Sequence, residues 1–243
     1  MTAETSQSPH FEPRSSDDDA ADVVVEPAGR SLNERIYNEI KQLILTNKMR
    51  QGHKLGHWEL AQLLKVSRTP VREALERLLQ EGYVKHIPRR GYFVAEIDAV
   101  EAKNLYQTRE ALEIFALQLT LERGLRPEQL RELEEIEELY ANLIETRRTN
   151  ERGRQDRDFH LRLASFSDND YIVRSLGAIF ERLLLKRRAD GYHSDRGSEA
   201  LREHKQLLEA LRNRDDELAV ATLRGHIRKA WTAFEEHLAD LAR

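Results

Sequence analysis

The sequence predicts a mainly α-helical protein, in which a small N-terminal domain with one β-hairpin is followed by an all-α antiparallel helical bundle. Apolar residues recur at three- to four-residue spacing through most of the chain, which is typical of amphipathic helices. Strand-like alternation is found around residues 83–94. Net formal charge is +5 over residues 31–97 and −4 over residues 98–243, so the two parts also differ in composition.

The composition is that of a globular protein with a highly charged surface. Of the 243 residues, 40% are hydrophobic and 34% are charged. The chain has no cysteine, which excludes disulfide bonds and cysteine-ligated zinc. No apolar run approaches the roughly 20 residues that cross a bilayer, and the acidic N-terminus lacks the apolar segment of a secretory signal. We therefore expect a cytoplasmic protein without membrane contacts.

Residues 1–29 predict a disordered leader. They are rich in Ser, Asp, Glu and Pro and contain a run of three aspartates at 17–19. Such a segment buries too little apolar surface to offset the entropy lost on ordering. The expected divisions of the chain are therefore a leader at 1–29, the small domain at 30–97 and the helical domain at 98–243.

The small domain begins with two predicted helices. Residues 31–47 place apolar side chains on one helical face, which predicts the first helix. Residues 58–64 predict a short second helix, whose Leu60, Leu63 and Leu64 we expect to face inward. A tight turn at residues 65–66 then leads into a third helix.

The stretch SRTPVREAL predicts the start of the third helix. Pro70 fits a first helical turn, where its missing N–H has no intrahelical partner, and either Ser67 or Thr69 can cap that turn. Arg68 and Arg72 lie one turn apart and project together on one side. The expected buried stripe consists of Val71, Ala74, Leu75, Leu78 and Leu79.

A β-hairpin is expected after the third helix. Alternation in residues 83–87 and 92–94 predicts its strands, and the turn between them holds Arg89, Arg90 and Gly91. The glycine allows close approach of the backbone to a partner, and the arginines can reach phosphates or an adjacent minor groove. Three helices followed by such a hairpin form a winged helix-turn-helix.

The arginines of the third helix and of the wing indicate double-stranded DNA as a partner. Two guanidiniums at the N-terminal end of an amphipathic helix suit base edges and phosphates in a major groove. A basic segment between acidic ones is also typical of a module that binds a polyanion. The alternative for the helix is a solvated surface helix, and for the wing a solvated turn. Their occurrence together favours DNA binding.

From residue 98 onward the pattern predicts six helices. Asp98 and Glu101 resemble a capping box at the start of the first helix. The apolar stripe of the second includes Leu133 and Leu139, and the polar residues 147–155 are expected to form a loop or a frayed join. The expected helical ranges are about 98–122, 127–146, 156–166, 171–188, 198–212 and 215–241.

Four side chains of the helical domain form a candidate metal site. Asp156 and His160 are four residues apart and share a helix face, whereas His204 and His226 lie among apolar residues of the last two helices. Three imidazoles and a carboxylate from inward helix faces can coordinate a divalent metal. No motif of adjacent residues demands the site. Taken singly, each histidine is also explained as a buried or boundary histidine.

The stretch VSRTPVREALERLLQEGYVKHIPRRGYFV resembles the DNA-binding domain of the GntR family of bacterial transcription regulators. The segments TREALE, DRDFH, SFSDN, EHKQLL and GHIRKA, in this order, resemble the FCD-type effector domain of its FadR subfamily. The resemblance covers residues 31–237, and six effector helices are similar to the shorter, VanR-like branch. Two positions depart from the family pattern: Trp58 replaces a basic residue, and Lys65 replaces the usual glycine of the turn.

The resemblance implies a homodimer that binds a near-palindromic operator in double-stranded DNA. Arg68, Thr69 and Arg72 match the family's recognition helix, and Arg90 and Gly91 match its wing tip. The expected DNA-contacting residues are Ser67, Arg68, Thr69, Arg72, Arg89, Arg90 and Gly91. The departure at Trp58 affects one basic phosphate contact, for which His57 or Lys65 is a possible substitute.

The resemblance also implies a divalent metal and a small organic acid as effector. The residues that match the metal ligands of the subfamily are Asp156, His160, His204 and His226. Zinc is the expected ion, with nickel and manganese as alternatives, and a carboxylate of the acid can complete its coordination. Arg109 matches an arginine that faces this cavity, and its alternative role is a surface salt bridge with Glu113. Asn169 is the second expected effector residue, although its position also fits a cap or turn.

Three functions agree with these observations. The first is a metabolite-responsive transcription regulator, most simply a repressor, in which the acid repacks helices around the metal and changes the geometry between two winged helices. The second is a metal-dependent hydrolase with an attached DNA-binding module. Three histidines and one aspartate nearly fill its metal site, and no further glutamate stands at motif spacing as a general base. The third is a regulator whose metal is purely structural.

Overall fold

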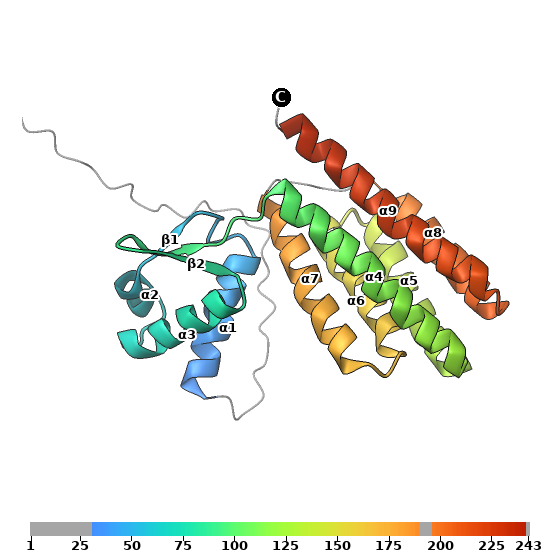
Figure 1. Ribbon diagram of the computed structural model, residues 1–243, viewed down its shortest axis with the longest axis horizontal. Coiled ribbons are helices and arrows are strands. Elements are labelled where there is room, and N and C mark those ends of the chain that lie inside the picture. The colour runs from blue at the N-terminus through green and yellow to red at the C-terminus, as the bar shows by residue number, and fades with distance from the viewer. Residues whose placement is uncertain (1–30, 190–195, 242–243) are drawn as a thin grey trace, which may run out of the picture. The chain divides into compact units, whose positions relative to one another are not determined.

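The computed structural model describes residues 31–189 and 196–241 (Figure 1). The described residues from Leu32 onward form one compact unit. The leader expected at residues 1–29 lies outside the described residues. Among the helices that are described, none is long and apolar enough to cross a membrane.

The first part of the compact unit has the expected winged helix-turn-helix fold. Its elements are α1 (Leu32–Leu45), β1 (Lys54–Leu55), α2 (His57–Leu63), α3 (Arg68–Gln80), β2 (Val84–Ile87) and β3 (Gly91–Val94). The strands form an antiparallel sheet of order β1-β3-β2, in which Lys54 lies opposite Phe93 and Val84 opposite Val94. The sequence does not predict β1, because two residues are too few to show alternation.

The core of this domain lies between α1 and α3. It is formed by Ile36, Ile40, Ile44, Val71, Ala74, Leu75 and Leu78. Two leucines that were expected to face inward are exposed, Leu63 by 59% and Leu79 by 37%. Leu63 is the last residue of a seven-residue helix, and Leu79 lies at the edge of the buried stripe. Lys65, in the turn before α3, has a φ of +54°, which explains why a glycine suits this position.

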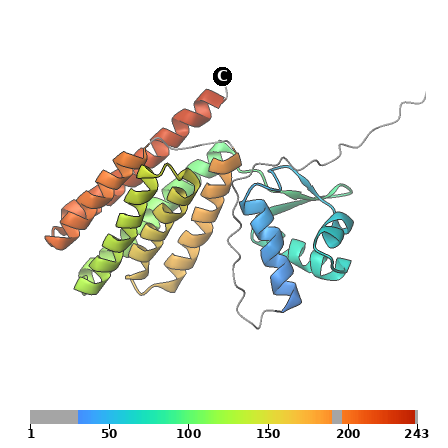
Figure 2. The ribbon, with the colours of Figure 1, turned by 180° about the vertical axis from the view of Figure 1, so that it is seen from behind.

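The second part of the unit is the expected all-helical bundle, shown from two sides in Figures 1 and 2. Its described helices are α4 (Ala99–Arg123), α5 (Pro127–Glu145), α6 (Thr149–Ser165), α7 (Asp170–Ala189), α8 (Gly197–Arg212) and α9 (Asp216–Leu241). The Asp98 side chain accepts a hydrogen bond from the backbone N–H of Glu101 and so caps α4. Helix α4 packs on α6, α7 and α9, and α5 packs on α6 and α8.

Helix α6 begins earlier than the sequence predicts. A loop or join was expected at residues 147–155, but only residues 147–148 of that range lie outside the helices, because α6 starts at Thr149. Its polar first turns carry no apolar stripe, but Gln155 Nε2 donates a hydrogen bond to the backbone oxygen of Ile136 on α5 (3.2 Å). Packing on α5 therefore extends the helix through a segment of weak local preference.

The bundle core contains aromatic side chains from several helices. Tyr106 of α4 lies 5.3 Å from Trp231 of α9 between ring centroids, and 6.3 Å from Phe234. Tyr106 and Phe234 are buried, whereas Trp231 is half-buried. Leu139 of α5 is 58% exposed, so its assignment to the buried stripe is wrong. Leu133 is fully buried, as the stripe predicts.

Candidate metal centre and nucleic-acid interface

The predicted DNA-binding residues of α3 are exposed at its N-terminal end. The helix begins at Arg68, and Ser67 is its N-cap residue with extended backbone, although its side chain makes no capping hydrogen bond. Pro70 is buried in the first turn, whereas Arg68, Thr69 and Arg72 are exposed. The structure thus presents both arginines on one surface. Their contact with DNA stays a prediction.

The wing tip is the turn between β2 and β3. Arg89 and Arg90 are exposed there. Arg89 has a φ of +63° and Gly91 a φ of +94°, so both occupy a left-handed conformation that tight turns require. A Cβ atom at Gly91 would meet no neighbour within 4 Å, so the glycine serves the backbone conformation and leaves the tip open.

Trp58 adds an aromatic side chain beside the N-terminal end of α3. It lies in the first turn of α2 and is 54% exposed. It lines an open surface hollow together with Lys65, Ser67 and Arg68. The departure from the family pattern therefore places a large apolar surface next to the predicted DNA contacts.

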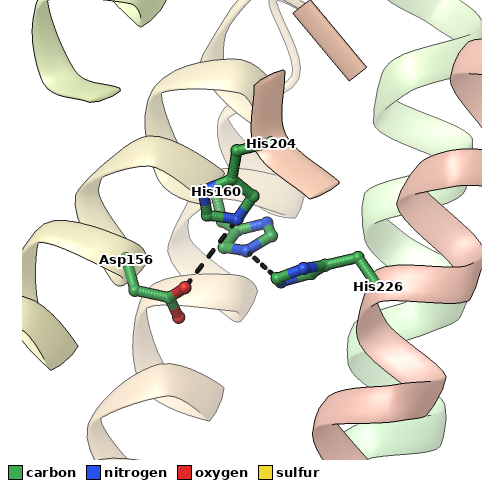
Figure 3. A group of neighbouring side chains, drawn as sticks. All are labelled: Asp156, His160, His204 and His226. Carbon is green, nitrogen blue, oxygen red and sulfur yellow. Dashed lines mark hydrogen bonds and ion pairs between the residues drawn. The ribbon is translucent and has the colours of Figure 1, made fainter. Parts of the chain in front are cut away.

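The four predicted metal ligands converge inside the helical domain (Figure 3). Asp156 and His160 come from α6, His204 from α8 and His226 from α9. One ligand atom from each lies within 4.8 Å of the others. The Nε2 atoms of His160 and His226 are 3.1 Å apart, and His204 Nε2 is 3.8 Å from Asp156 Oδ1. The helix packing thus brings together residues that are far apart in the sequence.

This arrangement fits a divalent cation. Two ligands of a single zinc ion can be at most roughly 4 Å apart, because each bond is about 2 Å long, so the cluster is only slightly wider than one coordination shell. The histidines are buried. His204 Nε2 is buried without a hydrogen-bond partner among the described residues, as expected of an atom whose lone pair is used by a metal.

The charges of these groups suit metal binding at neutral pH. Burial raises the pKa of Asp156, but the surrounding histidines outweigh this effect and hold that pKa below its ordinary range. Burial and the neighbouring His204 lower the pKa of His226 to about 3. Burial also lowers the pKa of His160. The carboxylate is therefore ionised and these two imidazoles are neutral, which are the forms that bind metals.

Three glutamates contact the histidines, and the sequence did not predict these contacts. Glu113 Oε2 lies 2.6 Å from Nδ1 of His160, and Glu203 Oε2 lies 2.9 Å from Nδ1 of His226. Glu137 Oε2 lies 3.0 Å from Nδ1 of His204. All three carboxylates are buried.

A signal for such residues was present in the sequence. Glu137 is four residues after Leu133 and three before Tyr140, so it occupies an apolar stripe. Glu203 directly precedes His204 on the buried face of α8. A charged residue on an inward helix face indicates a buried partner.

Arg109 faces the interior and contacts Glu113. It is 1% exposed, and its Nε donates a hydrogen bond to Glu113 Oε1. The predicted salt bridge is therefore present, but it is buried rather than on the surface. The guanidinium lies 4.4 Å from the ring centroid of Phe180, and its Nη2 is buried without a hydrogen-bond partner in the part of the chain described. Arg109 and His160 more than offset the effect of burial and lower the pKa of Glu113 to about 2.

Asn169 has a structural role at the start of α7. Its Oδ1 accepts hydrogen bonds from the backbone N–H groups of Tyr171 and Ile172, at 3.1 and 3.2 Å. The side chain therefore caps the helix, which is the alternative that its motif position also allowed. Its part in effector binding stays a prediction.

A winged helix-turn-helix joined to a helical domain with a buried cluster of metal-ligand type defines a transcription regulator of two domains. Residues 32–94 match the family described as bacterial regulatory proteins, gntR family, and residues 104–229 match the FCD domain. The chain therefore belongs to the GntR family and carries the FCD effector domain of FadR-like members.

Individual relatives agree with this assignment. The chain is 32% identical to the Nta operon transcriptional regulator of Aminobacter aminovorans over 74% of this chain and 83% of that protein. It is 25% identical to the HTH-type transcriptional repressor RspR of Escherichia coli K12, over 82% of this chain and 86% of that protein. A crystal structure of a GntR-type transcriptional regulator from Rhodococcus sp. RHA1 has the same fold, with a TM-score of 0.69, 24% identity and coverage of 82% and 95%. These relatives are transcription regulators rather than enzymes, so the hydrolase hypothesis is set aside.

Proposed function

We propose that this GntR-family regulator is a homodimeric repressor, and that a small organic acid bound at a divalent metal in the FCD domain controls its affinity for a near-palindromic operator. The observation that carries the proposal is the convergence of Asp156, His160, His204 and His226 in the interior of a domain joined to a winged helix-turn-helix.

The donor set supports zinc, with nickel and manganese as alternatives. Three imidazole nitrogens and one carboxylate oxygen suit borderline divalent ions. When bound, such an ion supplies a Lewis-acidic centre that attracts a carboxylate. Asp156 and the three histidines would hold it.

An acid as effector is supported by the surroundings of Arg109. Its Nη2 is a cationic donor that is buried without a hydrogen-bond partner among the described residues. A buried donor of this kind is costly unless a ligand satisfies it, and an arginine recognises a carboxylate through directed hydrogen bonds. The neighbouring Glu113 balances the charge of the guanidinium, so what remains for a ligand is the unsatisfied Nη2 donor, and the charge of an added carboxylate would be balanced by the metal.

Contacts of α7 support communication between the two domains. Phe180 lies under the guanidinium of Arg109, at the metal centre. The next residue, Glu181, accepts a hydrogen bond from the Tyr83 hydroxyl and forms an ion pair with Lys41 Nζ at 2.8 Å. Tyr83 and Lys41 belong to the winged helix-turn-helix. A shift of α7 on acid binding would therefore act on the DNA-binding domain and change the population of its binding-competent geometry.

The test begins with an operator selected from random DNA duplexes by the full-length, zinc-loaded protein. Fluorescence anisotropy then measures its dissociation constant in the presence of a panel of mono-, di- and tricarboxylic acids. We expect one class of acid to weaken operator binding at least tenfold in the unsubstituted protein and to have no effect on His226→Ala. Full metal occupancy of His226→Ala by elemental analysis contradicts the site.

The acid panel, combined with removal of the metal by a chelator, distinguishes the proposed function from a purely structural metal. Four ligands from three helices, three of them buried, are also what a structural ion needs. In that case chelation unfolds the helical domain, whereas no acid in the panel changes operator affinity.

A further inference from the structure

We infer that Glu113, Glu137 and Glu203 are positioning residues that fix the tautomers of the three histidines and turn every Nε2 lone pair toward the metal. The inference rests on the proposed metal site and concerns how that site is prepared. Each glutamate contacts a different histidine, and each does so at Nδ1.

The chemistry of the contacts sets the position of the proton. An ionised carboxylate has only acceptor atoms, so the imidazole nitrogen beside it must carry the hydrogen. Nδ1 of His204 and Nδ1 of His226 therefore donate, and their Nε2 atoms are left with lone pairs. The same proton position is inferred for His160, because two unprotonated acceptors would repel each other at the 2.6 Å between its Nδ1 and Glu113 Oε2, although these two atoms do not form a hydrogen bond of regular geometry in the structure. Without this constraint, a neutral imidazole can place its proton on either nitrogen, and the Nε2–H form cannot ligate through Nε2.

The distance between two Nε2 atoms of the cluster is one that either a hydrogen bond or a shared metal explains. With both Nδ1 atoms protonated, the Nε2 atoms of His160 and His226 face each other with two lone pairs at 3.1 Å. Such an approach is repulsive unless a cation lies between them, and two nitrogens of one tetrahedral zinc ion are about 3.4 Å apart. The glutamates thus hold two Nε2 lone pairs close together, and a bound metal would remove the repulsion between them.

The three glutamates differ in how their charge is balanced. Arg109 pairs with Glu113, and Glu203 forms ion pairs with Arg196 at 2.8 Å and Lys229 at 3.0 Å. No lysine or arginine in the described ranges forms an ion pair with Glu137, whose Oε1 is also buried without a hydrogen-bond partner there. Substitution of Glu137 therefore leaves no lysine or arginine of the described ranges without its ion-pair partner. Its effect on the histidine is thus the easiest of the three to interpret.

The experiment compares Glu137→Leu, Glu137→Gln and the unsubstituted full chain. The matched control is Glu138→Leu, which removes an exposed carboxylate from the adjacent position of α5. Zinc dissociation constants are measured by competition with a chromophoric chelator. We expect Glu137→Leu to weaken zinc binding about 10- to 100-fold. Glu137→Gln should recover part of the loss, because its amide oxygen still accepts a hydrogen bond from Nδ1, and Glu138→Leu should bind zinc as the unsubstituted chain does.

A second measurement needs no metal. Long-range ¹H–¹⁵N NMR of the metal-free protein distinguishes the two tautomers of His204. The expected result is the Nδ1–H form in the unsubstituted chain and a mixture in Glu137→Leu. The inference is overturned if metal-free His204 is in the Nε2–H form, or if folded Glu137→Leu binds zinc as tightly as its control. A chain that binds no zinc at all refutes the proposed metal, while the NMR result still decides the tautomer.

Discussion

Two arginines show how surroundings determine what a guanidinium can do in this protein. The side chain of Arg72 is 63% exposed, and its Nε is 4.0 Å from Glu76 Oε1, a solvated ion pair that contributes little to stability. Arg109 is 1% exposed and is paired with a buried carboxylate. Its removal leaves an uncompensated charge in the interior. The first arginine is therefore available to DNA, whereas the second is held by Glu113 and has only its Nη2 available to a buried ligand.

Arg72→Ala should weaken operator binding at least tenfold and change the free energy of unfolding by less than about 0.5 kcal/mol. The reason is that an exposed side chain loses a base or phosphate contact but no packing. Anisotropy and urea denaturation measure the two effects. Arg131→Ala, which removes an equally exposed arginine from α5, is the control. Equal losses of operator affinity in Arg72→Ala and Arg131→Ala would mean that binding depends only on the overall charge and that α3 does not contact DNA.

Arg109→Met should destabilise the metal-free protein by about 3–5 kcal/mol, because Glu113 is left buried and unpaired. The double variant Arg109→Met, Glu113→Gln should regain a large part of that loss, since the orphaned charge is removed with its partner. Urea denaturation of the two single variants and the double variant gives the coupling free energy. Strictly additive losses would show that the pair does not interact.

At the scale of single elements, α6 shows that tertiary contacts can extend a helix. Its first turns are polar and contain Gly153, and the helix forms there because it packs on α5. A Cβ atom at Gly153 would meet Leu184 Cδ2 at 3.5 Å, an ordinary van der Waals distance. No feature of the packing therefore requires glycine at this position.

Gly153→Ala should accordingly stabilise the protein by up to about 1 kcal/mol, the difference in helix propensity between the two residues. Thermal unfolding of the variant measures the change. Gly91→Ala serves as the contrast. It places a side chain on a backbone with a φ of +94° and should therefore destabilise the protein. A destabilised Gly153→Ala would indicate that α6 does not extend through this residue in solution.

The same helices show what could be predicted from the sequence. Asp156 and His160 were found because a four-residue spacing places them on one face, and His204 and His226 because they interrupt apolar stripes. Glu137 lies within an acidic run of α5, and only the packing of α5 on α8 shows that it faces a histidine. Helix periodicity thus predicts which face is buried, whereas the partner across the interface depends on tertiary structure.

At the scale of the whole molecule, the candidate centre connects three helices that are distant in the sequence. Its ligands come from α6, α8 and α9. A metal that binds only the folded state would act as a cross-link, and its binding free energy would add to stability.

Removal of the metal should therefore lower the melting temperature. At a free zinc concentration 100 times the dissociation constant, binding adds about 2.7 kcal/mol, which corresponds to roughly 5–10 °C for a chain of this size. Differential scanning calorimetry before and after chelation measures the shift, and re-addition of zinc should reverse it. His226→Ala should show no shift with chelator. A chelator effect that persists in this variant would locate the responsible ion elsewhere.

The positions of the two tryptophans allow each domain to be followed by its own intrinsic fluorescence. Trp58 lies beside the predicted DNA contacts of the winged helix-turn-helix, and Trp231 packs against Tyr106 in the bundle. The chain has no other tryptophan. Each domain thus carries one intrinsic fluorophore, so Trp231→Phe and Trp58→Phe yield proteins whose emission reports on a single domain. DNA and effector binding can then be followed separately in solution without an attached dye.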